Sequence, residues 1–202
     1  MEKIIDQKDN PREGLTTLKL LQLLRLFLPW NTKTLARLDK FKNLDIEKLN
    51  KLSDLNIKGI ILDTDDCIAH NHGDILPENV EHIKELNKKG IKIAIYSNMA
   101  KSDRYEPIEK YAKILTNLPP KPSKKGFEQA VKALGVPKSQ IVMIGDNYIT
   151  DSGSIHIGVP FIKVNPIGGD RGLIMKAYDK LRNFYDKISR LHDKFRPPPI
   201  SL

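Results

Sequence analysis

The chain has 202 residues, of which 40% are hydrophobic and 29% are charged. These proportions exclude a disordered chain, because there is enough apolar surface to offset the entropy lost on ordering, and the length suits one domain with short additions. The 34 lysine and arginine residues outnumber the 25 acidic residues, so the formal net charge is +9. This charge favours anionic partners such as phosphorylated substrates, acidic lipids or nucleic acid, although a solvated lysine-rich surface would produce it as well.

Cys67 is the single cysteine, which excludes an intrachain disulfide and a cysteine-rich zinc site and fits a reducing compartment. The longest apolar stretch, residues 15–28, is interrupted by polar side chains and is shorter than the about 20 residues of a membrane-spanning helix. No small-residue cleavage site follows it, so it does not resemble a secretory signal. We therefore expect a cytoplasmic protein without a transmembrane helix.

Residues 1–56 are predicted to form a basic, leucine-rich helical segment ahead of the main domain. Within it, residues 15–42 contain six lysine and arginine residues against one acidic residue, Asp39. The leucine side chains could lie in the interface of an anionic membrane, with Lys19, Arg25, Lys33 and Arg37 near lipid phosphates. Alternatively, the segment packs on the rest of the fold.

From about residue 57 the sequence alternates short β-branched apolar runs with helical patterns, which is typical of a parallel sheet connected by helices. The predicted strands are residues 58–62, 91–96, 113–115, 140–144 and 161–164. The predicted helices are residues 77–89, 103–111 and 123–134. Residues 57–170 are thus expected to form a Rossmann-like α/β domain, with a parallel sheet and helices on both faces.

Residues 171–202 are predicted to be a C-terminal amphipathic helix followed by a proline-rich tail. Apolar side chains recur at spacings of three and four from Ile174 to Phe195, which places them along one side of a helix. Such a seam usually docks on the protein's own body, although it could also form a coiled-coil dimer. Residues 196–202 are expected to be frayed.

Polar residues follow several of the predicted strands, where open parallel sheets bind their ligands. Carboxylates gathered there would repel one another unless a cation lay among them, and oxygen ligands suit Mg²⁺. A hydroxyl, a backbone N–H and an ammonium group could bind phosphoryl oxygens. Each residue alone has an ordinary explanation as a helix cap or turn, but together they predict a phosphoryl-transfer site. These residues are Asp63, Asp65, Ser97, Asn98, Lys121, Asp146 and Asp151.

Four segments carry a family resemblance: GIILDTDDCI at 59–68, IYSN at 95–98, Lys121-Pro122, and IGDNYITD at 144–151. In this order they resemble the four motifs of the haloacid dehalogenase superfamily of phosphatases, over residues 57 to about 165. Within that superfamily the chain is most similar to the type IIIA branch, which includes the YqeG-like bacterial proteins and the mitochondrial phosphatidylglycerophosphate phosphatases. The resemblance implies the haloacid dehalogenase-like fold.

The resemblance also implies catalytic roles. Asp63 would be the nucleophile that forms an aspartyl-phosphate, and Asp65 would protonate the leaving group and then deprotonate the attacking water. Ser97 and the backbone of Asn98 would bind the transferring phosphoryl group. Lys121 would neutralise charge on the nucleophile and the phosphate.

The implied cofactor is Mg²⁺. It would be held by Asp63, the main-chain carbonyl of Asp65 and Asp146, while Asp151 would support the metal or orient Lys121. Position 66 departs from the family pattern, because the closest families usually have asparagine where this chain has Asp66. The extra carboxylate could weaken phosphate binding by repulsion or cap the following turn.

The spacing of the motifs leaves no room for a cap domain, because only 31 residues separate Asp65 from Ser97 and 22 separate Asn98 from Lys121. An open site suits a large substrate, and a bilayer could cover it. The resemblance implies a phosphatidylglycerophosphate phosphatase bound peripherally to the inner face of a membrane, or to the matrix side in a mitochondrion. The alternatives are a soluble phosphatase acting on a nucleic-acid end or small ester, and a catalytically silent interaction module. Aromatic residues make up only 6% of the chain and offer few rings on which bases could stack, so nucleic acid is the less favoured partner. The oligomeric state is left open.

Overall fold

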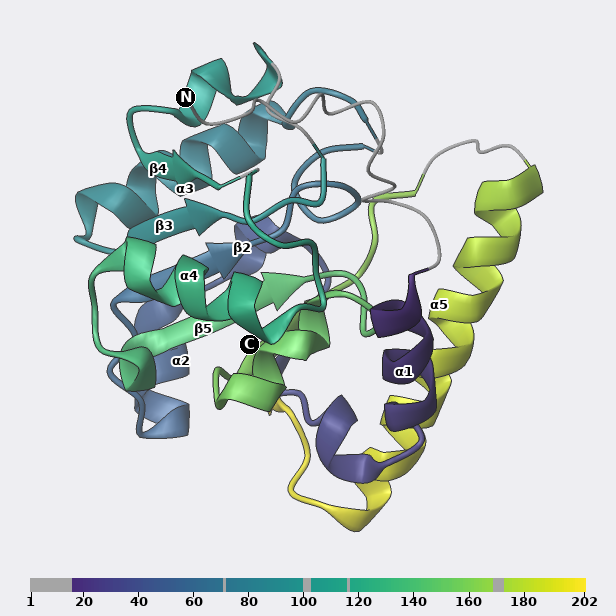
Figure 1. The fold of residues 1–202 in the computed structure, drawn as a ribbon. Coiled ribbons are helices and arrows are strands. Elements are labelled where there is room, and N and C mark those ends of the chain that lie inside the picture. The colour runs from purple at the N-terminus through teal and green to yellow at the C-terminus, as the bar shows by residue number, and fades with distance from the viewer. Residues whose placement is uncertain (1–15, 71, 100–102, 116, 169–172) are drawn as a thin grey trace.

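The computed structural model describes residues 16–70, 72–99, 103–115, 117–168 and 173–202, without the side chains of residues 173–175. These residues contain a seven-stranded sheet in the order β4-β3-β2-β5-β6-β1-β7, and every pairing between its strands is parallel (Figure 1). The predicted α/β fold is confirmed. The strands are β1 (Ala36–Leu38), β2 (Gly59–Leu62), β3 (Lys92–Ile95), β4 (Ala112–Ile114), β5 (Ile141–Gly145), β6 (Phe161–Val164) and β7 (Ile200–Ser201).

Five α-helices surround this sheet in the described part of the chain: α1 (Thr17–Arg25), α2 (Ile46–Ser53), α3 (Pro77–Lys88), α4 (Lys124–Leu134) and α5 (Leu173–His192). Helix α4 begins where the Ser123 hydroxyl accepts a hydrogen bond from the Gly126 N–H, and it ends at Gly135, which has a φ of 65°. The helix predicted over residues 103–111 is wrong in type. A 3₁₀-helix spans Asp103–Ile108 instead, with Pro107 inside it, and proline disfavours a longer α-helix there.

Helices cover both faces of the sheet, so a ligand can reach it only at an edge. Ile60 and Leu62 pack into the cluster beneath α2 and α3, whereas Ile61 packs into the cluster beneath α4. In the parallel register, Leu62 at the end of β2 lies opposite Ile144 in β5. The residues that follow these two strands therefore leave the sheet at the same edge.

Both terminal segments add strands to the sheet, which the sequence pattern did not predict. Residues 36–38, expected in a helical segment, form β1, in which Ala36 pairs with Ile162 of β6. Residues 200–201, expected in a frayed tail, form β7, in which Ile200 pairs with Ala36. Strands of two or three residues are too short to show a period of two, so periodicity could not reveal them.

Helix α5 lies beside α1 at one flank of the molecule (Figure 1). As predicted, it packs on the protein's own body, but not through the whole predicted seam. Tyr185 and Ser189 are buried there, and the Ser189 hydroxyl donates to the Thr32 carbonyl at 3.1 Å. Four seam residues are instead exposed, namely Ala177, Phe184, Leu191 and Phe195. The side chain of Ile174 lies outside the described residues. Of the described helices, none is both long and apolar enough to cross a bilayer.

Candidate active site

Strands β2 and β5 deliver the first two acidic residues of the site. The Asp63 N–H donates to the Ile144 carbonyl at 2.9 Å, so the chain is still tied to β5 one residue past the end of β2. Asp146 follows Gly145, the last residue of β5. A Cβ atom at position 145 would lie 2.3 Å from Asp151 Oδ2, so glycine is needed for Asp151 to approach the strand end.

Asp63, Asp146 and Asp151 form a buried acidic cluster, in which one carboxylate oxygen from each lies within 4.8 Å of the others. The Lys121 Nζ atom lies 2.7 Å from Asp63 Oδ1 and 2.6 Å from Asp151 Oδ1. Burial raises the pKa of Asp151 to about 8, and the neighbouring Asp63 charge acts in the same direction. Burial alone would lower the pKa of Lys121, but its two carboxylate partners outweigh burial and raise it. Lys121 therefore remains charged and compensates the cluster.

The hydrogen bonds leave two carboxylate oxygens available. Asp63 Oδ1 accepts from Lys121 and from the Thr64 N–H, and none of the described donors reaches Asp63 Oδ2. Asp146 accepts a hydrogen bond through Oδ2, whereas its Oδ1 likewise has no donor among the described residues. Oxygen ligands on two neighbouring strand ends fit a hard divalent cation such as Mg²⁺.

Asp151 is placed differently from the other two carboxylates. Its Oδ1 accepts from Lys121 Nζ, and its Oδ2 accepts from the Asn147 N–H at 3.0 Å. Both oxygens are therefore engaged. Of the two roles considered for Asp151, this geometry favours orienting Lys121.

Ser97 and Asn98 follow β3 and reach the same edge. Asn98 Oδ1 accepts from the Lys121 N–H at 2.7 Å, and Asn98 Nδ2 donates to the Lys121 carbonyl at 3.3 Å. The Asn98 side chain thus holds the backbone that carries the lysine. The Ser97 side chain is buried, and its hydroxyl accepts from the Met99 N–H. Phosphate binding by these two residues stays a prediction.

The carboxylate of Asp65 is not part of the acidic cluster and pairs with an arginine instead. Arg104 holds both of its oxygens, at 2.8 and 3.1 Å, and the His72 N–H donates to Oδ1. Burial raises the pKa of Asp65, but its hydrogen bonds and charge pairing with Arg104 prevail, so the pKa lies below its ordinary value. Asp65 is held here as a carboxylate, and acting as an acid would require it to leave Arg104.

Two arginines of the site were not identified from the sequence. Arg104 lies in the 3₁₀-helix after β3, and Arg182 comes from α5. The Arg182 Nη1 atom donates to Asp146 Oδ2 at 2.6 Å and to Asp66 Oδ2 at 2.9 Å. The unusual carboxylate at position 66 was the one feature of the sequence that could have indicated a buried arginine here, since a buried charge requires a partner of opposite charge.

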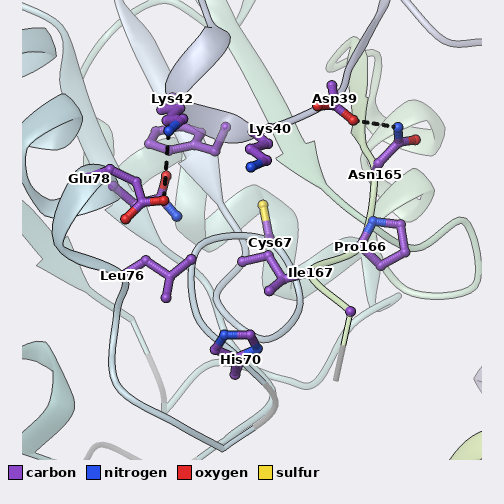
Figure 2. Close-up of a pocket in the computed structure, with 13 residues that line it drawn as sticks. Asp39, Lys40, Lys42, Cys67, His70, Leu76, Glu78, Asn165, Pro166 and Ile167 are labelled. Atoms are coloured by element: carbon purple, nitrogen blue, oxygen red, sulfur yellow. Dashed lines mark hydrogen bonds and ion pairs between the residues drawn. The ribbon is translucent and has the colours of Figure 1, made fainter. Parts of the chain in front are cut away.

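A cavity of about 310 Å³ adjoins the loop that follows β2 (Figure 2). Figure 2 shows Lys40 above the Cys67 sulfur, which points up toward it, and His70 below. The Ile167 N–H donates to the Asp66 carbonyl at 2.8 Å, which connects the cavity wall to the loop that follows β2. Burial raises the pKa of the Cys67 thiol, and the charges of the acidic cluster add to this, so Cys67 is not a ready nucleophile.

Comparison with known proteins links this geometry to a family. A family model described as haloacid dehalogenase-like hydrolase matches residues 19–155. The protein named "Probable phosphatase YqeG" of Bacillus subtilis (strain 168) is 30% identical over 133 residues, which cover 62% of this chain and 74% of the relative. The family match extends from α1 past Asp151 and so includes every predicted site residue.

Solved structures give more distant matches. An uncharacterized protein from Listeria monocytogenes serotype 4b matches with a TM-score of 0.43 and 18% identity, covering 57% of this chain and 85% of its own. A HAD superfamily (subfamily III A) hydrolase from Legionella pneumophila matches with a TM-score of 0.39 and 15% identity, covering 75% and 100%. The 3-deoxy-D-manno-octulosonate 8-phosphate phosphatase of Moraxella catarrhalis, solved with magnesium and phosphate ions, matches with a TM-score of 0.41 and 14% identity, covering 73% and 99%.

Proposed function

The chain belongs to the haloacid dehalogenase-like hydrolase family, and from this we propose that it is a magnesium-dependent phosphatase that converts phosphatidylglycerophosphate to phosphatidylglycerol at a membrane surface. The membrane part of the proposal is carried by one observation, the exposed apolar face of α1. The chemical part is supported by the cluster around Asp63.

In the proposed reaction, the free Oδ2 of Asp63 attacks the phosphorus atom, and the bond from phosphorus to the alcohol oxygen breaks. Asp65, protonated and released from Arg104, gives its proton to that oxygen. Asp65 then takes a proton from a water molecule, which attacks the aspartyl-phosphate, releases inorganic phosphate and restores Asp63. Lys121 stays protonated throughout and neutralises Asp63 and the incoming phosphoryl oxygens.

The metal would be held by the carboxylate of Asp63 and by the free Oδ1 of Asp146, with the main-chain carbonyl of Asp65 as the further ligand implied by the family. When bound, Mg²⁺ supplies positive charge that stabilises the phosphoryl oxygens. Asp151 has both oxygens occupied, so in this proposal it orients Lys121 and is not a metal ligand.

Helix α1 turns two of its polar residues inward and four of its five leucines outward, which is the reverse of a helix on a soluble protein. Lys19 is 5% exposed and Gln22 is 1% exposed. The Gln22 amide donates to Ser152 Oγ at 3.0 Å, and its oxygen lies 2.8 Å from His156 Nε2. The exposed leucines of α1 are Leu18, Leu20, Leu21 and Leu24, while Thr17 and Arg25 are exposed at its two ends. This outward face is apolar and suits the interface of a bilayer.

The exposed surface continues from α1 onto the neighbouring segments. Phe27 and Trp30 are exposed just after α1, and the Phe27 ring contacts the Phe184 ring of α5 at a centroid distance of 6.3 Å. Of the basic residues expected near lipid phosphates, Arg25 and Lys33 are exposed. Lys19 is buried, and Arg37 forms ion pairs with α5 and the turn after it, so these two expectations were wrong. The remaining charges still favour an anionic membrane.

A phosphate-release screen of the purified full chain tests this function. We expect Mg²⁺-dependent release from phosphatidylglycerophosphate in anionic vesicles, with weaker release from soluble sugar and nucleotide phosphates. Chelation with EDTA should stop release, and added Mg²⁺ should restore it. Preferential release from oligonucleotide ends with none from the lipid would refute the lipid substrate, and release unaffected by EDTA would refute the metal-dependent chemistry.

A further inference from the structure

Asp66 and Arg182 meet beside the proposed metal ligand Asp146, although 115 residues separate them in the chain. The Arg182 side chain is buried, and Nη1 bridges Asp66 Oδ2 at 2.9 Å and Asp146 Oδ2 at 2.6 Å. Nη2 donates to Asp179 at 2.8 Å, which fixes the guanidinium from the side of α5. The contacts therefore place one cation directly on an oxygen of Asp146.

An arginine alone at this position would oppose the binding of a divalent cation, because its charge would repel the ion and compete with it for Asp146. Asp66 supplies a second carboxylate to the same Nη1 atom. Compared with asparagine, Asp66 adds one negative charge where Arg182 adds one positive charge. The net charge around Asp146 is therefore the same as it would be if position 66 were asparagine and Arg182 were absent.

We propose that Asp66 and Arg182 are a compensating pair of positioning residues that holds Asp146 for metal binding, with Oδ2 fixed by the guanidinium and Oδ1 left for the ion. This inference rests on the metal site proposed above. Hydrogen bonds to a ligating carboxylate orient it, and removing such a partner typically changes metal affinity by about 10–100-fold. The pair also makes α5, which carries the exposed Phe184, a part of the active site.

The pair can be tested by rescue, with Mn²⁺ as the probe and the free ion counted by electron paramagnetic resonance. Asp66 has a φ of 59°, which asparagine adopts readily, so Asp66→Asn should fold normally. We expect this variant to bind Mn²⁺ about tenfold more weakly, because the charge of Arg182 then repels the ion and competes with it for Asp146 without the offsetting charge of Asp66. The double variant Asp66→Asn/Arg182→Gln should recover most of the lost affinity, because glutamine removes the positive charge and keeps an amide donor for Asp146 Oδ2.

Lys180 provides the matched control, because it is an exposed cation on the same helix. Asp66→Asn/Lys180→Gln should bind Mn²⁺ as weakly as Asp66→Asn alone. If removal of Arg182 gave no rescue, or if the Lys180 change rescued equally, the compensating pair would be disproved. Absence of Mn²⁺ binding by the unaltered protein would instead contradict the metal site itself, so the two failures are distinguishable.

Discussion

Replacing Asp63 by asparagine should reduce phosphate release by about 10⁴-fold or more, the scale seen when a covalent nucleophile is removed from an enzyme. An amide oxygen cannot attack phosphorus in this way, and it loses the charge that pairs with Lys121. The fold should persist, because Lys121 keeps its 2.6 Å contact to Asp151 and the Asp63 N–H bond to β5 does not involve the side chain. Initial rates measured with Mg²⁺, together with a thermal unfolding curve, check both expectations.

The control for this variant is Asp54→Asn. Asp54 is an exposed carboxylate at the end of α2 with a φ of 53°, a conformation that asparagine tolerates. It should leave the rate unchanged. Phosphate release by Asp63→Asn at the rate of this control would remove the basis for the proposed chemistry.

Changing the outward face of α1 should separate lipid from soluble substrates. Leu20 is 51% exposed, Leu24 64% and Trp30 63%, so glutamine at all three positions removes apolar area without opening the core. If each side chain contributes about 1 kcal/mol by burial in the bilayer interface, vesicle binding should weaken by about 10²-fold. Sedimentation with anionic vesicles measures this, and turnover of a soluble ester should be preserved.

Leu52→Gln is the control for the α1 variant, because Leu52 is 53% exposed on α2, at the opposite flank of the molecule from α1 (Figure 1). It should not change vesicle binding. Deleting α1 would be a poorer test, since Leu26 directly after it is fully buried in the core. Equal vesicle binding by the triple variant and the unaltered protein would remove the support for membrane contact.

The sequence predicted the parts of the fold whose signals are local. The strands β2, β5 and β6 are β-branched or apolar runs ended by polar residues, and the parallel sheet then brings their carboxyl ends together. Asp63, Lys121, Asp146 and Asp151 therefore meet as the motif order implied.

Contacts between residues far apart in the chain could not be predicted from these local patterns. The contact of Arg182 with Asp146 joins α5 to the end of β5, and no periodicity in α5 distinguishes this arginine from the exposed cations of the helix. The orientation of α1 was equally hidden, because its leucines could face the core or the solvent. It depends on Ser152 and His156, which hydrogen-bond Gln22 and so turn the polar side inward.

The most direct test of the proposed chemistry is the binding of beryllofluoride, which forms a tetrahedral analogue of an aspartyl-phosphate on a reactive carboxylate. Fluorine NMR of the full chain should show protein-bound resonances when Mg²⁺ and beryllofluoride are both present. These resonances should vanish without Mg²⁺ and in Asp63→Asn, while Asp54→Asn retains them. Bound resonances that persist in Asp63→Asn would contradict the assignment of Asp63 as the group that accepts the phosphoryl group.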